Sequence, residues 1–236
     1  MKLLKDSIAI VAILCCAVSL YAQDSQYKWL HPTPQGNTLR WVKMWDANNW
    51  YATGDAATFM KTTNGGSSWI IKSNIITVPD DYPSNFYGAE FLDMNTGFIC
   101  TQYGKIIKTT DAGNTWDTSG YVLQPCNVWR KVRFLNSNTG FAAGSSLAFT
   151  TDGGNSWSQY PNSLGNLGDV YARDLNNVVV VSGVNSNYSF TTNGGTSWFT
   201  ASMGGAGNCE TMEFLNDTLG FVCGSSGRIR MTINGG

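Results

Sequence analysis

Side-chain oxygens in a short recurring motif are the residues of this sequence whose types and spacing could do chemistry. In the pattern Thr-x-Asp/Asn-x-Gly-x-Ser/Thr-Trp, an Asp or Asn lies between two hydroxyl residues. Oxygens so closely spaced could bind a hard cation such as calcium, or could accept hydrogen bonds from the backbone of a tight turn. Asn64, Asn193 and Asn234 replace the acid in three of five copies, whereas calcium prefers carboxylates. The pattern therefore predicts a structural turn, here named the box turn, with no metal and no cofactor.

The box turn recurs at a nearly fixed period. Its closing tryptophans are 47, 41 and 41 residues apart, and a fifth copy begins at Thr232. A fixed period of this size indicates an array of one supersecondary unit. The residues assigned to the box turns are Thr62, Asn64, Gly66, Trp69, Thr109, Asp111, Gly113, Trp116, Thr150, Asp152, Gly154, Trp157, Thr191, Asn193, Gly195, Trp198, Thr232, Asn234 and Gly236.

Carboxylates outside the box turns offer a second kind of chemistry, the paired acids of a glycoside hydrolase. Asp80, Asp81 and Glu90 are the candidates for such a pair. Asp80, Asp81 and Tyr82 lie in the one long insertion between repeats, so we predict a ligand-binding loop there, with a solvated surface loop as the alternative. The single histidine, His31, has no partners at catalytic or metal-binding spacing. We therefore predict no catalytic residue.

The cysteines allow a disulfide. Of six cysteines, Cys15 and Cys16 lie in the N-terminal segment, which leaves four in the remaining chain. Cys209 and Cys223 flank an expected hairpin turn near 216–219, so they could face each other on paired strands. Four cysteines allow three connectivities, and free buried thiols are the alternative.

Residues 1–22 resemble a signal peptide. Lys2 and Lys5 form a charged start, an apolar run follows at 8–20, and cleavage is expected after Ala22. The mature protein is therefore expected to be secreted, or periplasmic or at the cell surface of a bacterium. No later segment is long and apolar enough to span a membrane.

The composition predicts an all-β domain that binds no nucleic acid. The chain has 26 glycines, 9 tryptophans and 13% charged residues, and it lacks a long segment with the 3.6-residue apolar period of a helix. Its net charge of −1 provides no basic surface for nucleic acid.

Each repeat reads as strand, turn, strand, short strand, box turn, strand. Four strands in about 41 residues are typical of a blade of a β-propeller. The first strands are expected at Val42-x-Met44, Ala89-x-Phe91, Val132-x-Phe134, Tyr171-x-Arg173 and Met212-x-Phe214. The residues between those pairs should share one face; they are Lys43, Glu90, Arg133, Ala172 and Glu213. Because the charges alternate, we expect Glu90 to lie near Lys43 or Arg133.

The repeats predict one propeller domain at 23–236, with five blades visible. Trp29 lies 40 residues before Trp69, so residues 27–31 occupy the place of a fourth strand. If the ring closes at five blades, this segment should pair with the strand at 228–232. The alternative, which the interrupted fifth box turn favours, is part of a larger propeller that is incomplete at its C-terminus.

These repeats resemble the Asp-boxes, or BNR repeats, of bacterial sialidases, sortilin-type receptors and photosystem II stability/assembly factors. The unit Asn138–Trp157 is most similar to assembly-factor-like BNR proteins secreted by Bacteroidetes-type bacteria. The resemblance runs from about Trp29 to Gly236 and implies box turns between the third and fourth strands of propeller blades.

The resemblance also implies a function, although a fold alone does not. Sialidases need an arginine cluster and an Arg-x-Pro motif, and this chain lacks the motif. The assembly-factor resemblance implies a non-catalytic binding or scaffolding module for a protein or peptide, without implying photosynthetic partners. The alternative is a carbohydrate-binding or glycoside-hydrolysing propeller, closer to xyloglucanases than to sialidases.

Overall fold

The computed structural model describes residues 35–76, 84–117, 128–160, 164–205 and 207–235. Contacts divide the chain into Met1–Gly36 and Asn37–Gly236, and every described strand belongs to the second unit. The expected signal peptide, the expected fourth strand at 27–31, the residues Asp80, Asp81 and Tyr82, and Gly236 of the fifth box turn lie outside the described residues. Within them, no helix is long and apolar enough to cross a membrane.

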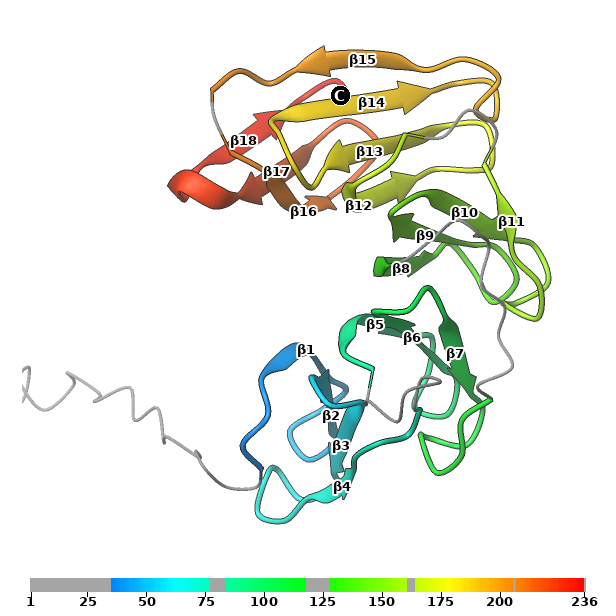
Figure 1. Cartoon of the computed structure of the whole chain (residues 1–236), viewed down its shortest axis with the longest axis vertical. Coiled ribbons are helices and arrows are strands. Elements are labelled where there is room, and N and C mark those ends of the chain that lie inside the picture. The colour runs from blue at the N-terminus through cyan, green and yellow to red at the C-terminus, as the bar shows by residue number, and fades with distance from the viewer. Residues whose placement is uncertain (1–34, 77–83, 118–127, 161–163, 206, 236) are drawn as a thin grey trace, which may run out of the picture. The chain divides into compact units, whose positions relative to one another are not determined.

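The described strands form five antiparallel sheets, here called blades 1 to 5, each made from consecutive strands (Figure 1). Blade 1 contains β1 (Leu39–Met44), β2 (Trp50–Gly54), β3 (Thr58–Thr62) and β4 (Ile70–Lys72). Blade 2 contains β5 (Phe86–Phe91), β6 (Gly97–Thr101) and β7 (Ile106–Thr109). Blade 3 contains β8 (Trp129–Phe134), β9 (Gly140–Gly144), β10 (Leu147–Thr150) and β11 (Ser158–Gln159). Blade 4 contains β12 (Leu167–Ala172), β13 (Val178–Ser182), β14 (Asn187–Thr191) and β15 (Phe199–Ser202). Blade 5 contains β16 (Cys209–Phe214), β17 (Gly220–Gly224) and β18 (Ile229–Thr232), with a 3-10 turn at Ser225–Gly227.

The predicted strand order is confirmed in blades 1, 3 and 4. In each, the third strand ends at the box turn and the fourth strand follows the box tryptophan. In blade 2, Asp117 makes a single antiparallel bridge to Lys108 of β7 in the place of a fourth strand. The all-β expectation from composition and period is therefore correct.

Every first strand carries the same irregularity. The register against the second strand shifts by one residue near the start of β1, β5, β8, β12 and β16. A bulge of this kind bends a strand and increases its twist. The first strands of adjacent blades contact one another, most extensively β5 with β8 and β12 with β16.

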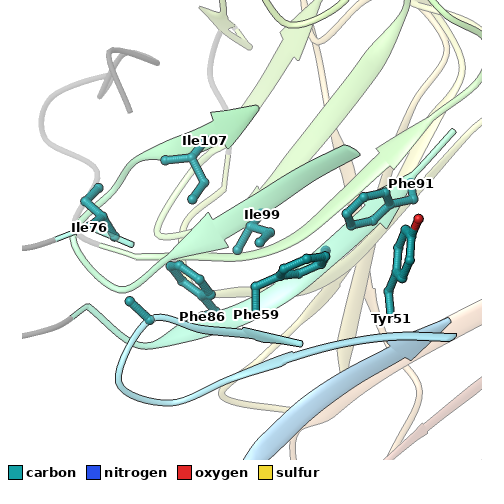
Figure 2. Close-up of a cluster of buried hydrophobic side chains, with 9 residues drawn as sticks. Tyr51, Phe59, Ile76, Phe86, Phe91, Ile99 and Ile107 are labelled. Atoms are coloured by element: carbon teal, nitrogen blue, oxygen red, sulfur yellow. The ribbon is translucent and has the colours of Figure 1, made fainter. Parts of the chain in front are cut away.

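Apolar residues fill the space between adjacent blades. Between blades 1 and 2, aromatic side chains of β2, β3 and β5 meet isoleucines of β6 and β7 (Figure 2). Phe59 is 1% exposed and stacks on Phe91 with ring centroids 6.0 Å apart, while Tyr51 packs edge-on against both rings. Fully burying side chains of this size contributes about 1.5–3 kcal/mol each, so these junctions hold neighbouring blades together.

One expected strand column is wrong in blade 4. The register places Tyr171 opposite Val179, as Glu90 lies opposite Phe98 and Arg133 opposite Phe141. The residue equivalent to Glu90 and Arg133 is therefore Tyr171, and not Ala172. The expected apolar pair Tyr171-x-Arg173 likewise moves back by one residue, to Val170 and Ala172.

Candidate functional site

The four fully described box turns have one geometry, whether they contain Asp or Asn. The threonine hydroxyl donates to the Asp or Asn side chain at 2.8–3.0 Å and accepts the N–H of the glycine four residues on at 2.9–3.0 Å. The same side-chain oxygen accepts the N–H of the Ser or Thr four residues on, at 2.8–3.0 Å. In the fifth copy, Thr232 donates to Asn234 at 2.8 Å.

Each box-turn carboxylate accepts three hydrogen bonds from its own turn. Hydrogen bonds from Thr115 and Ser156 lower the pKa values of Asp111 and Asp152, each to about 2. In the part of the chain that the structure describes, no group of three or more His, Cys, Asp or Glu residues is placed to hold a metal ion. The hydrogen bonds that these carboxylates accept close the box turn.

Each box turn is also attached to the hairpin between the first two strands of its blade. A backbone N–H in the box turn donates to a carbonyl of that hairpin, as Gly153 does to Asn138 at 2.9 Å. The hairpins are closed by an Asp or Asn whose side chain accepts the N–H groups two and three residues on. Hydrogen bonds therefore join the two turns at the same end of each blade.

The expected Cys209–Cys223 disulfide is absent: both residues are free thiols. The bulge at the start of β16 pairs Cys209 with Gly224 and Thr211 with Cys223. The two cysteines are consequently not opposite one another, and Cys209 is buried while Cys223 is exposed. Burial raises the pKa of the Cys209 thiol.

A cluster of charged side chains from the first strands is the candidate functional site. Arg133 of β8 donates to Asp169 of β12 at 3.3 Å, to the Met212 carbonyl at 3.3 Å and to Glu213 of β16 at 3.5 Å. It therefore joins three blades. The Asp169 side chain is 0% exposed, whereas that of Glu213 is 78% exposed.

Asp169 is buried because β12 and β16 approach closely. A Cβ atom on Gly168 would lie 1.9 Å from the Cys209 carbonyl oxygen, so only glycine fits at this position. The approach lets Asp169 accept hydrogen bonds from the Thr211 hydroxyl at 2.9 Å and the Met212 N–H at 3.1 Å. Buried charges require such pairing. The sequence analysis missed Asp169; its signal was a lone acid directly after glycine in an otherwise apolar strand.

Glu90 is the second acid of this cluster, on β5. One carboxylate oxygen accepts the Phe134 N–H at 2.9 Å. Burial raises the pKa of Glu90 to about 7, although the positive charges of Arg133 and Lys43 and the hydrogen bond from Phe134 act in the opposite direction. Both expected cations therefore act on Glu90, but the ion pairs that Arg133 makes within 4 Å are those with Asp169 and Glu213.

These side chains line a cavity of about 160 Å³, here called the first-strand pocket. Glu90, Arg133 and Glu213 provide its charged groups, and Leu135 and Tyr171 are among its apolar and aromatic walls. Leu135 is 41% exposed. The pocket thus combines a cation, two carboxylates and an apolar surface open to solvent, which suits it to binding one side chain of a larger ligand.

Solved structures of known proteins share this fold. A chain described as "YCF48 bound to D1 peptide" aligns over 84% of this chain and 65% of its own, with 22% identity and a TM-score of 0.65. YCF48 from Cyanidioschyzon merolae aligns over 86% of this chain and 69% of its own, with 16% identity and a TM-score of 0.61. The GH74 xyloglucanase from Xanthomonas campestris aligns over 81% of this chain and 36% of its own, with 11% identity and a TM-score of 0.56.

No protein-family model and no curated protein matches the sequence. The chain spans 65% of the length of the peptide-bound YCF48 chain, at 22% identity. Likeness at this level concerns architecture alone. Together with the five antiparallel sheets, it shows that the chain is a β-propeller built from blades of up to four strands.

Proposed function

We propose that this chain is a non-catalytic binding or scaffolding module that acts outside the cytoplasm on a protein or peptide. The observation that carries the proposal is the first-strand pocket, in which Arg133, Glu213 and Leu135 surround a space of about 160 Å³. Pockets for whole small molecules typically measure about 300–1,000 Å³. A space of this size instead accepts one side chain that projects from a longer ligand.

The charges of the pocket suit a peptide. Arg133 is fixed by Asp169 and retains hydrogen-bonding capacity towards the pocket, because a guanidinium has five donors. Glu213 is an exposed acceptor beside it. A peptide offers both carbonyl acceptors and N–H donors for such a pair, and an apolar side chain could pack on Leu135.

Two further points support the proposal. The fold is shared with a YCF48 chain whose description includes a bound D1 peptide. The signal-like features of residues 1–22 support a location outside the cytoplasm, as secretion, or placement in the periplasm or at the cell surface of a bacterium, would provide. No cofactor enters the proposal.

The test is a binding screen of the immobilised chain against a peptide library, followed by affinity measurements on the strongest peptide. Leu135→Ser should weaken binding at least tenfold, because it removes the apolar wall of the pocket. Leu215→Ser is the matched control: Leu215 is 78% exposed at the equivalent position of blade 5 and does not line the pocket. Equal affinities of both variants for the peptide would refute the site.

A second candidate function, glycoside binding or hydrolysis, is favoured by one observation. Glu90, with a pKa raised to about 7, and the exposed Glu213 line the same pocket, and glycosidases use a pair of carboxyl groups of which one has a raised pKa. The Phe134 N–H donates to one Glu90 oxygen and so favours the ionised form, which reduces the fraction of Glu90 that carries a proton to donate. Release of reducing sugars from polysaccharides, including xyloglucan, that Glu213→Gln abolishes would establish hydrolysis and displace the peptide proposal.

A further inference from the structure

Glu90 is an acid of the first-strand pocket without an ion-pair partner. Among the described residues it accepts one hydrogen bond, from the Phe134 N–H at 2.9 Å, and no cation lies within 4 Å of its carboxylate. The side chain is half-buried and lines the cavity. Burial raises its pKa to about 7, so the surrounding charges do not compensate for the hydration that the ionised form loses. A further cation beside Glu90 would supply that compensation.

The cations of the neighbouring strands are engaged elsewhere. Arg133 of β8 donates to Asp169 at 3.3 Å, and this fully buried carboxylate neutralises its charge. The ammonium of Lys43 on β1 lies over the ring of Trp45, 5.1 Å from the centroid. At these positions both cations lower the pKa of Glu90 only in part, and the negative charge of Asp169 raises it. Glu90 therefore keeps the capacity to bind a cation that comes from a ligand.

The remaining walls of the pocket favour a cation that has an apolar stem. Glu213 adds a carboxylate to those of Glu90 and Asp169, so that three acids face the two cations of this cluster. An excess of negative charge attracts a cationic group and repels an anionic one. Leu135, which is 41% exposed, and Tyr171 provide a surface against which methylene groups can pack. The pocket therefore suits a side chain that is apolar along its length and positive at its end.

We propose that the first-strand pocket binds a lysine or arginine side chain of a peptide, whose cationic group reaches Glu90 while its stem packs against Leu135. This inference rests on the peptide-binding function proposed above and adds the chemistry of the bound side chain. Binding and ionisation of Glu90 are linked, because a cation favours the charged carboxylate. The affinity should therefore rise between pH 6 and pH 8, a range in which lysine and arginine keep their charge.

Four pentapeptides test the charge of the bound side chain. Each is acetyl-Gly-Ser-X-Ser-Gly-amide, with lysine, arginine, norleucine or glutamate at X. In NMR titrations of the full chain at pH 8, the lysine and arginine peptides should bind at least tenfold more tightly than the norleucine peptide, which keeps the stem without the charge. The glutamate peptide should bind most weakly. Equal affinities of the lysine and norleucine peptides would overturn the proposal.

Glu90→Gln locates the contact. Glutamine keeps an oxygen for the Phe134 N–H but carries no charge, so the lysine peptide should lose at least tenfold in affinity at pH 8. Glu210→Gln is the matched control and should lose little, because Glu210 is an exposed acid of β16 that does not line the cavity. Lowering the pH from 8 to 6 should weaken lysine binding about tenfold in the natural chain and not in Glu90→Gln. A preference for lysine that survives Glu90→Gln would contradict the assignment.

Leu135→Ser separates this inference from the proposed function. If this variant weakens peptide binding while the lysine and norleucine peptides bind the natural chain alike, the pocket binds peptides and the choice of a basic side chain is wrong. If neither the library nor the four pentapeptides yield a bound peptide, both proposals fail. Binding of n-butylammonium as tight as that of the lysine peptide would assign the pocket to a free amine and overturn the peptide assignment.

Discussion

We expect Glu90 to make the stability of the propeller depend on pH. Its pKa is raised from 4.5 to about 7, so the folded chain binds a proton at pH values where the unfolded chain has lost it. The free energy of unfolding should therefore fall as the pH rises from about 4.5 to 7, and stay low above that range. At 1.36 kcal/mol per pKa unit, the loss is about 3 kcal/mol.

Glu90→Gln tests this at a single residue. Glutamine keeps an oxygen that can accept the Phe134 N–H but carries no charge. Urea unfolding at pH 5 and pH 8 should show a flatter pH dependence for the variant, which should also be more stable than the natural chain at pH 8. Glu213→Gln, at an exposed carboxylate, is the control and should change little. Parallel pH profiles for Glu90→Gln and the natural chain would contradict the prediction.

Gly154 in the third box turn is constrained in two ways. Its φ is +78°, and an added Cβ would lie 2.4 Å from Phe98 of blade 2. Gly204 has a similar φ of +74° with nothing within 4 Å of the added atom. Gly204→Ala should therefore cost about 1 kcal/mol for the backbone alone, and Gly154→Ala about 2–4 kcal/mol because overpacking adds to it. Thermal denaturation of both variants compares them, and equal losses would show that Phe98 moves away freely.

The register of β12 was predicted wrongly from the sequence, and the burial of Asp169 was not predicted at all. In blades 1, 2, 3 and 5 the residue that closes the first hairpin follows two positions after a Met or Phe. In blade 4 the residue two positions before the closing Asp174 is the small Ala172. The expected apolar pair was placed on the large neighbouring residue Tyr171 instead, which shifted the predicted register by one residue. Counting back from Asp174 would have found the register. Asp169 could not be found in this way, because its burial depends on the approach of β16, a strand about 40 residues away in the sequence.

Elements were more predictable than their junctions. Strand order and turns follow from alternation and from turn residues, which are local signals. The contact between a third strand and the next blade joins residues far apart in the sequence, so no local signal predicts it. Lys61 of β3 donates to Asn114 in the box turn of blade 2 at 2.9 Å, and Lys108 of β7 donates to Asn155 in that of blade 3 at 2.9 Å. The lysines also bond to the box-turn carbonyls of Ala112 and Gly153.

A double-mutant cycle measures this junction. Lys108→Met and Asn155→Ala should each destabilise the chain, with a coupling energy of about 0.5–1.5 kcal/mol, because they remove the same hydrogen bond. The control cycle combines Lys108→Met with Asn114→Ala, because the Asn114 side chain bonds to Lys61 and not to Lys108. The two losses of stability in this cycle should add within about 0.5 kcal/mol. Chemical denaturation gives all the values. Additivity in both cycles would show that the contact carries no specific energy.

At the scale of the whole molecule, four blades have a fully described box turn that is closed by hydrogen bonds from its own residues. Their side-chain oxygens accept hydrogen bonds from their own turn, with Asn and Asp in the same geometry. Treatment with EDTA should therefore leave the thermal midpoint unchanged, as followed by circular dichroism. A fall of several degrees that calcium restores would contradict the turn interpretation, and Asp111→Asn and Asp152→Asn would then locate the ion.

The lysine contacts mean that the repeats are not interchangeable. The position of Lys61 and Lys108, directly before the box threonine, holds Phe149 in blade 3 and Phe190 in blade 4, and the residue equivalent to Asn114 and Asn155 is Thr196 in blade 4. Deleting blade 3 in frame would bring Lys108 against Thr196, which lacks the amide oxygen that its present partner provides. Gene duplication can lengthen such an array by copying a blade, but these pairs constrain which copies can be neighbours. The order of the blades is therefore constrained at the two junctions where a lysine contacts the box turn of the next blade.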